Sequence, residues 1–128
     1  METKTVNIGV NKRTNSKGDV ILKRRVWLEG KTLERLGWVK GVTYSRTTQL
    51  LEDGFILTKD NAGDLRVAGG SNRPVLDLCG NYIAAVLGTI EDGYKEVSVT
   101  ITEKKITITG KAAAMLLPVL VKALEVAA

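Results

Sequence analysis

The sequence contains no histidine and only one cysteine, Cys79, among its 128 residues. Without histidine, the chain cannot form a His-based nucleophile triad, a His general base or a metal site that includes His. A single cysteine excludes an intrachain disulfide and cannot build a zinc site alone, and the carboxylates show no metal-ligand spacing. No complete glycine motif for phosphates or dinucleotides occurs either. We therefore expect that the chain is not an enzyme, needs no cofactor and resides in the reducing cytoplasm.

Long apolar runs are also missing. The first ten residues, METKTVNIGV, contain no apolar stretch of signal-peptide length. Residues 111–127, KAAAMLLPVLVKALEVA, predict a helix, but the run is shorter than the roughly 20 residues that span a bilayer, and it includes Lys122 and Glu125. We expect no contact with a membrane. The predicted C-terminal helix is expected to pack on a sheet, and its other candidate role is to join two copies as a homodimer.

Basic residues are concentrated in the first part of the sequence. The chain has 19 Lys and Arg against 14 Asp and Glu, a net charge of +5. Residues 1–73 hold 14 of the basic and 8 of the acidic residues, whereas residues 74–128 hold 5 and 6. A basic lobe favours an anionic partner, for which nucleic acid is the usual candidate. Charge that only keeps the protein in solution is the other interpretation.

Strand patterns account for most of the chain. Residues 5–13 (TVNIGVNKR) and 20–28 (VILKRRVWL) flank the turn-forming cluster TNSKGD, which predicts a β-hairpin. One face of the second strand is mostly apolar and the other largely basic, because side chains alternate along a strand. The apolar face carries Val20, Leu22, Arg24, Val26 and Leu28. Further hairpins are expected at residues 42–60, 58–70 and 96–110, around the turns EDG, NAGD and EKK.

A glycine pattern repeats about fifty residues apart, which indicates an internal duplication. Gly30, Gly37 and Gly41 recur as Gly80, Gly88 and Gly93. Both copies run strand, glycine, short helix, glycine, strand, turn, strand. One such unit has an apolar face and open edges, so two units are expected to pair and close a barrel or sandwich. We predict one mostly β domain, residues 1–128, built from repeat units at approximately 5–59 and 60–110, with the short helices as lids.

Several of these segments resemble a known family. LERLGWVKGVTY (33–44) and LEDGFILTK (51–59) resemble the swapped-hairpin domain of AbrB-like regulators, including SpoVT/AbrB and MazE-type proteins. RVWLEGKTLERLGWVKG (25–41) is similar to the SymE-like branch of that superfamily. The resemblance implies two tandem swapped-hairpin units that form one pseudo-dimeric barrel. It also implies that the basic first hairpin, NKRTNSKGDVIL (11–22), presents Lys12, Arg13 and Lys17 to DNA.

The first hairpin carries the candidate binding residues. A two-stranded ribbon fits the major groove, while Lys and Arg on its rim neutralise phosphates. The predicted nucleic-acid-binding residues are Lys12, Arg13, Lys17, Lys23, Arg24 and Arg25. Arg24 faces away from Lys23 and Arg25, so the last two, with Lys12 and Arg13 across the hairpin, are preferred. The alternative is that these charges only keep a sheet edge solvated.

Three functional classes follow from these observations. The favoured one is a DNA-binding protein, a transcriptional regulator whose partner is double-stranded DNA. The second is a protein-interaction module that binds through a sheet edge or the C-terminal helix. The third, implied by the resemblance alone, is a SymE-like toxin acting on RNA or nucleoid DNA.

Overall fold

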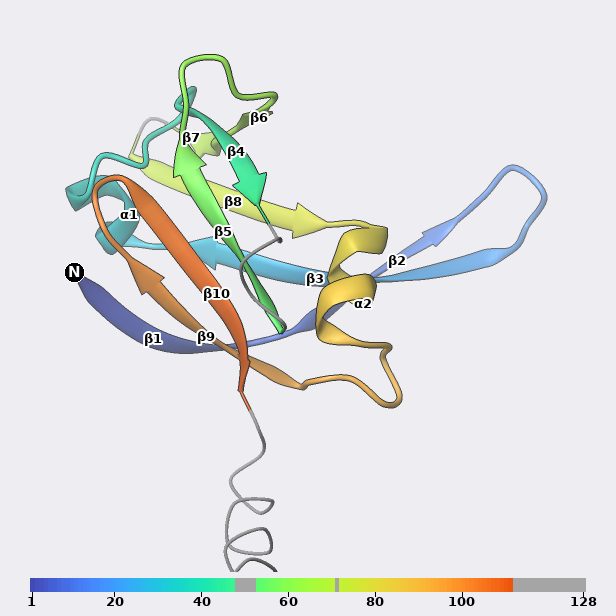
Figure 1. Ribbon diagram of the computed structural model, residues 1–128. Helices are drawn as coiled ribbons and strands as arrows, with labels where there is room; N and C mark the ends of the chain where they lie inside the picture. Colours follow the sequence, from blue (N-terminus) through green and yellow to red (C-terminus); the bar gives the residue numbers. More distant parts are fainter. Residues whose placement is uncertain (48–52, 71, 112–128) are drawn as a thin grey trace, which may run out of the picture.

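The computed structural model describes residues 1–47, 53–70 and 72–111 (Figure 1). Strands make up most of this part of the chain, so the predicted mostly β fold is confirmed. The elements are β1 (Glu2–Asn7), β2 (Gly9–Thr14), β3 (Val20–Glu29), α1 (Lys31–Arg35), β4 (Thr43–Thr47), β5 (Gly54–Lys59), β6 (Leu65–Arg66), β7 (Ala68–Gly70), β8 (Arg73–Cys79), α2 (Asn81–Leu87), β9 (Glu96–Ile101) and β10 (Lys105–Lys111). The helix predicted for residues 111–127 lies outside the described residues, except for Lys111, which instead ends β10.

The strands form two antiparallel sheets. One has the order β1-β9-β10-β5-β4-β6 and the other the order β2-β3-β8-β7. Neither sheet closes on itself among the described strands. The two sheets share one core, to which the smaller contributes Leu28 and Leu76 and the larger contributes Leu57 and Ile108. Apolar residues at alternate positions of both sheets are therefore removed from water together, which is the main source of stability in such a fold.

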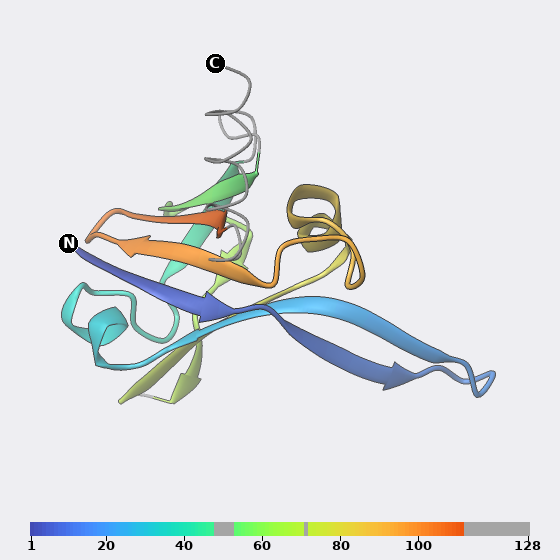
Figure 2. The ribbon, with the colours of Figure 1, turned by 90° about the horizontal axis from the view of Figure 1, so that it is seen from below.

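The first extended segment belongs to both sheets. β1 pairs with β9, whereas β2 pairs with β3. Between them, Ile8 donates its backbone N–H to the carbonyl of Lys95 at 2.9 Å. The single strand predicted for residues 5–13 was therefore wrong, because the chain passes from one sheet to the other at Ile8, between β1 and β2. Figure 2 shows this segment running along both sheets.

Each short helix begins after a glycine with positive φ. Gly30 has φ 119° before α1, and Gly80 has φ 150° before α2. Residues with a Cβ rarely adopt this conformation, so glycine is needed before both helices. One turn later, Leu33 in α1 and Ile83 in α2 are fully buried. The short helices predicted between glycines are confirmed at both places.

Of the three hairpins predicted after residue 41, two form and one does not. β4 pairs with β5 and β9 pairs with β10, as expected for residues 42–60 and 96–110. The hairpin predicted for residues 58–70 does not form, because β6 pairs with β4 and not with β5. Both edges of β5 are already paired, one with β10 and one with β4. β6 therefore takes the remaining edge of β4.

Four strand pairs, β1–β9, β4–β6, β3–β8 and β5–β10, join the first half of the chain to the second, and the last two have a common pattern. The β3–β8 register is centred on Trp27 opposite Asp77, and the β5–β10 register is centred on Ile56 opposite Thr107. Along the sequence, the separation within each central pair is nearly the same as the separation between Gly30 and Gly80, the glycines that precede the two short helices. A twofold axis through the central pair would exchange the two strands and leave equivalent residues opposite each other. Both registers have this property.

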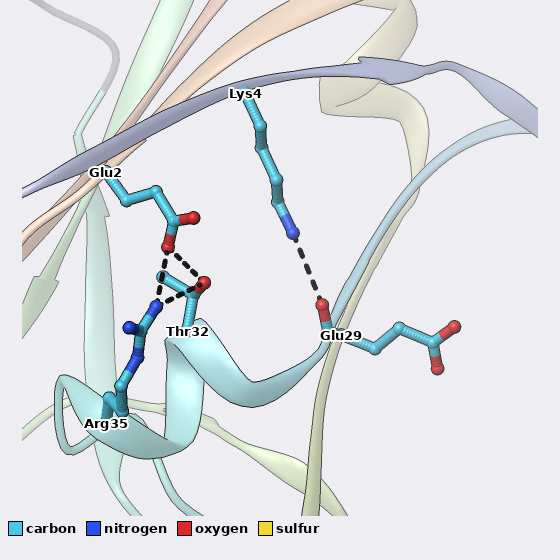
Figure 3. Close-up of polar contacts among 5 residues, drawn as sticks. All are labelled: Glu2, Lys4, Glu29, Thr32 and Arg35. Carbon is cyan, nitrogen blue, oxygen red and sulfur yellow. Dashed lines mark hydrogen bonds and ion pairs between the residues drawn. The ribbon is translucent and has the colours of Figure 1, made fainter.

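Polar contacts hold β1 beside α1 (Figure 3). The carboxylate of Glu2 accepts hydrogen bonds from the Thr32 hydroxyl and from the Arg35 guanidinium, whose Nη2 lies 3.2 Å from Glu2 Oε2. Lys4 Nζ donates to the backbone carbonyl of Glu29 at 3.3 Å. These groups are exposed, so water screens their attraction and each contact adds little stability. Their effect is to position the edge strand.

Candidate nucleic-acid interface

Part of the β2–β3 hairpin extends beyond the body of the protein (Figures 1 and 2). We call residues 10–23 the arm. Lys12 pairs with Leu22, and Thr14 pairs with Val20 at its far end. None of the residues 10–23 belongs to the buried core, which begins on this strand at Arg24 and Val26. The arm is therefore held by its own strand pairing and by its continuity with the sheet.

The turn of the arm is closed by Asn15. Its side-chain Oδ1 accepts the backbone N–H groups of Lys17 and Asp19, both at 2.9 Å. Gly18 has φ 85°, a conformation that favours glycine. Asn and Gly perform these functions in many turns, and the hairpin predicted around TNSKGD is confirmed.

The corresponding hairpin of the second half is much shorter. In β2–β3, residues 12–22 lie between the paired residues Asn11 and Lys23. In β7–β8, only residues 71 and 72 lie between the paired residues Gly70 and Arg73. The long arm therefore belongs to the first half alone.

The arm has two different faces, because residues opposite each other in the ladder point to the same side. Asn11, Arg13 and Lys23 share one face with Arg25. The first three, together with Ile21 and Cys79, line a hollow of about 230 Å³. The opposite face carries Lys12 and three exposed apolar residues. These are Val10, Val20 and Leu22, with 45%, 55% and 52% of their surface exposed.

Four of the six predicted binding residues lie on the arm. Lys12, Arg13 and Lys17 are exposed and Lys23 is half-buried. Arg13 and Lys23 share one face, Lys12 lies on the other, and Lys17 is in the turn. In the described part of the chain, no carboxylate lies within ion-pairing distance of these four cations. With Asp19 as the only acidic residue of the arm, its net charge is positive.

Arg24 does not face solvent, which corrects the inclusion of this residue in the binding surface. Only 4% of its surface is exposed. The guanidinium donates hydrogen bonds to the carbonyl oxygens of Leu87 at 3.2 Å, Gly88 at 2.7 Å and Tyr94. Burial lowers the pKa of Arg24 from its ordinary value. Its position on the core face of β3 makes it an internal tie between the base of the arm and the end of α2.

Arg25 lies at the base of the arm and is already paired. Its Nε and Nη2 donate to the two carboxylate oxygens of Asp77 at 2.7 and 2.9 Å. Hydrogen bonding to the Asp77 carboxylate raises the pKa of Arg25. The guanidinium carbon also lies 4.3 Å from the ring centroid of Trp27, which is 40% exposed. The sequence did not identify Trp27 as a candidate site residue, although the alternation along the strand places it on the same face as Arg25. It did not identify Asp77 either, because only the β3–β8 pairing brings this residue near Arg25.

A second hollow, of about 470 Å³, lies between the base of the arm, the start of α2 and residues 89–92. Lys23 and Asn81 line it together with Glu91 and Asp92. Within residues 1–47, 53–70 and 72–111, no group of three or more His, Cys, Asp or Glu side chains could hold a metal ion. Over the same residues, no helix has both the length and the apolar character needed to cross a bilayer.

Comparison of the chain with protein-family models finds no match, and comparisons with curated proteins and with solved structures find none either.

Proposed function

We propose that this protein binds double-stranded DNA through the arm and acts as a transcriptional regulator. The observation that carries this proposal is the arm itself: it extends beyond the body, contributes nothing to the core, and carries four cations against one carboxylate. A hairpin that contributes no side chain to the core, and that concentrates one sign of charge, is well suited to an anionic partner.

The two-stranded form of the arm fits this role. A two-stranded β-ribbon can enter the major groove of B-DNA, where its rim reaches phosphates on either side. Arg13 and Lys23 lie on one face of such a ribbon and Lys12 on the other. Arg13 and Lys23 can therefore face the groove together, while Lys12 and the turn residue Lys17 contact phosphates at its rim. Arg24 takes no part, because it is buried.

For the architecture we propose two tandem swapped-hairpin units of the AbrB-like kind, which enclose one core as a pseudo-dimer with a barrel-like interior. Support comes from the central pairs Trp27–Asp77 and Ile56–Thr107, about which the two halves are interleaved. Further support comes from the glycines that precede α1 and α2, since both have positive φ. In this arrangement the second unit completes the core, and the first unit alone provides the contact with DNA.

The test is duplex binding measured at a series of salt concentrations. We expect the triple variant Lys12→Ala, Arg13→Ala, Lys17→Ala to bind roughly tenfold or more weakly at low salt. Its slope of log affinity against log salt should shrink by about 0.9 for each phosphate that the variant no longer neutralises. A matched control removes three exposed lysines outside the arm, Lys40, Lys104 and Lys105. Equal affinity of the two triple variants would refute the proposal.

A second experiment shortens the arm to the length of its counterpart. Residues 12–22 are replaced by Ser-Asn, the sequence of residues 71–72. Because residues 10–23 lie outside the buried core, we expect the shortened protein to unfold cooperatively with little change in stability, and to lose duplex binding. Retained binding in a folded, shortened protein would contradict the proposal.

One observation favours a second candidate function, a protein-interaction module. Val10, Val20 and Leu22 are exposed on the same face of the arm, beside the open edge of β2. Open strand edges and exposed apolar side chains are typical of surfaces that pair with another chain. If no duplex or single strand binds at low salt, this function becomes the preferred one.

A further inference from the structure

We propose that the outer face of the four-stranded sheet binds single-stranded nucleic acid, with an unpaired base stacked on Trp27. This site is centred on Trp27 and overlaps the groove contact proposed for the arm at Arg13 and Lys23. It depends on the sheet face and not on the turn of the arm.

The outer face is defined by strand alternation. On β3, Arg24, Val26 and Leu28 are buried, whereas Arg25 and Trp27 between them are not. β8 follows the same rule: Leu76 and Leu78 are buried, and the intervening residue is exposed. The outer face therefore consists of side chains that no other described element covers completely. Its members are Arg25, Trp27 and Glu29 on β3, and Arg73, Val75, Asp77 and Cys79 on β8.

Trp27 is held in place from one side. The Arg25 guanidinium lies 4.3 Å from the ring centroid, and Asp77 fixes that guanidinium by two hydrogen bonds. Because the carboxylate already fixes the guanidinium, and the guanidinium lies on the indole ring, these side chains lose little conformational entropy when a base stacks on Trp27. The indole keeps 40% of its surface exposed, whereas Trp38, the other tryptophan, is fully buried. Any of the bases can stack on an exposed aromatic ring, and many proteins bind single-stranded nucleic acid in this way on the face of a β-sheet.

The surrounding charge fits a sugar–phosphate backbone. Lys23 is four residues from Trp27 on the same face of β3, a distance of about 13 Å at roughly 3.3 Å per residue. A single-stranded nucleic acid with one base stacked on Trp27 can thus place a neighbouring phosphate near Lys23 and Arg13. Both side chains line the hollow of about 230 Å³. Arg73 adds a further cation at the other end of β8. Of the two carboxylates on this face, Asp77 is paired with Arg25, and Glu29 lies on the side of Trp27 away from Lys23.

Tryptophan fluorescence provides the test. The probes are a 15-nucleotide oligo-dT and a blunt 15-base-pair duplex, each added to the full chain. We expect oligo-dT to quench the emission of Trp27, and to leave the Trp38 emission that remains in Trp27→Phe unchanged. Binding of labelled oligo-dT should weaken at least about fivefold in Trp27→Ala and stay within about threefold in Trp27→Phe, since phenylalanine can still stack. Equal affinity of wild type and Trp27→Ala, or no quenching, would overturn the inference.

A double variant, Lys12→Ala with Lys17→Ala, separates this site from the arm contact. Neither residue lies on the outer face. We expect it to bind duplex more weakly while oligo-dT still quenches Trp27. Quenching by oligo-dT without any duplex binding would support the stacking site and refute the groove contact, whereas arm-dependent duplex binding without quenching would do the opposite.

Discussion

Arg24 offers the sharpest test of how the arm is anchored. It is the one charged residue among the buried side chains of the described chain. Its guanidinium donates to the carbonyls of Leu87, Gly88 and Tyr94, two at the end of α2 and one just before β9. The Leu87 and Gly88 carbonyls have no partner within α2, which ends there, although Leu87 also accepts the backbone N–H of Tyr94 at 2.9 Å. A cation is well placed to bind carbonyls at a helix C-terminus.

The expected effect of Arg24→Ala is a loss of about 3 kcal/mol in the free energy of unfolding. A hydrogen bond from a charged donor contributes roughly 1.5–3 kcal/mol, and a buried carbonyl left unpaired costs about 1–3 kcal/mol. The three bonds do not add in full, because water will enter and bind part of the exposed carbonyl surface. Arg24→Lys should lose about half as much, since an ammonium group keeps the charge but cannot reach three separate acceptors.

Equilibrium urea denaturation, followed by Trp38 fluorescence and far-UV circular dichroism, measures this loss. Arg25→Ala is the matched control on the neighbouring residue. Its ion pair with Asp77 is partly exposed, with 31% and 38% of the two side chains accessible, so its removal should cost at most about 1 kcal/mol. A loss below about 0.5 kcal/mol in Arg24→Ala, or a larger loss in Arg25→Ala, would refute this account of the buried tie.

Three further outcomes are expected. Gly54→Ala should lower the free energy of unfolding by more than about 2 kcal/mol, because a Cβ there would lie 2.3 Å from the Ile108 carbonyl oxygen, while Gly70→Ala, which meets nothing within 4 Å, should be nearly neutral in the same urea titration. Burial raises the pKa of Tyr82 to about 12. The contribution of Tyr82 to stability is therefore intact below pH 10 and is lost as the pH rises through about 12. In thermal denaturation from pH 9 to 12, the unfolding midpoint should decline more steeply in wild type than in Tyr82→Phe. Leu22→Thr, on the exposed face of the arm, should change the unfolding midpoint by less than about 2 °C, and a larger fall would mean that this face is covered.

Local patterns in the sequence were enough to predict much of the fold. Period-two alternation identified the strands and separated Arg24 from Lys23 and Arg25, and glycines located both short helices. These signals work because side-chain direction and positive φ are set by neighbouring residues alone. The prediction that Lys12, Arg13 and Lys17 form a basic hairpin also rested on a local turn signal, which Asn15 and Gly18 provide.

Other features depend on contacts that no local pattern contains. Val20 and Leu22 continue the apolar face of Val26 and Leu28, yet they are exposed because the strand has already left the body at that point. Alternation shows that a face is apolar, but it does not show how far a second sheet extends to cover it. The same reason explains the failure for residues 58–70: whether β6 joins β5 or β4 depends on which edges are already occupied.

The difference between the two halves has a consequence for recognition. Both halves contribute to one core through β3–β8 and β5–β10, so neither can be removed without exposing the other. Only the first half carries an arm, since the second hairpin turns back directly after Gly70. A regulator with two equal arms would read two half-sites related by a twofold axis, and its operator would mirror that symmetry. With one arm for each chain, the proposed contact covers a single groove segment, and its strength comes from phosphate neutralisation by a small number of cations. On this reasoning, a single chain is matched to a target site without internal symmetry.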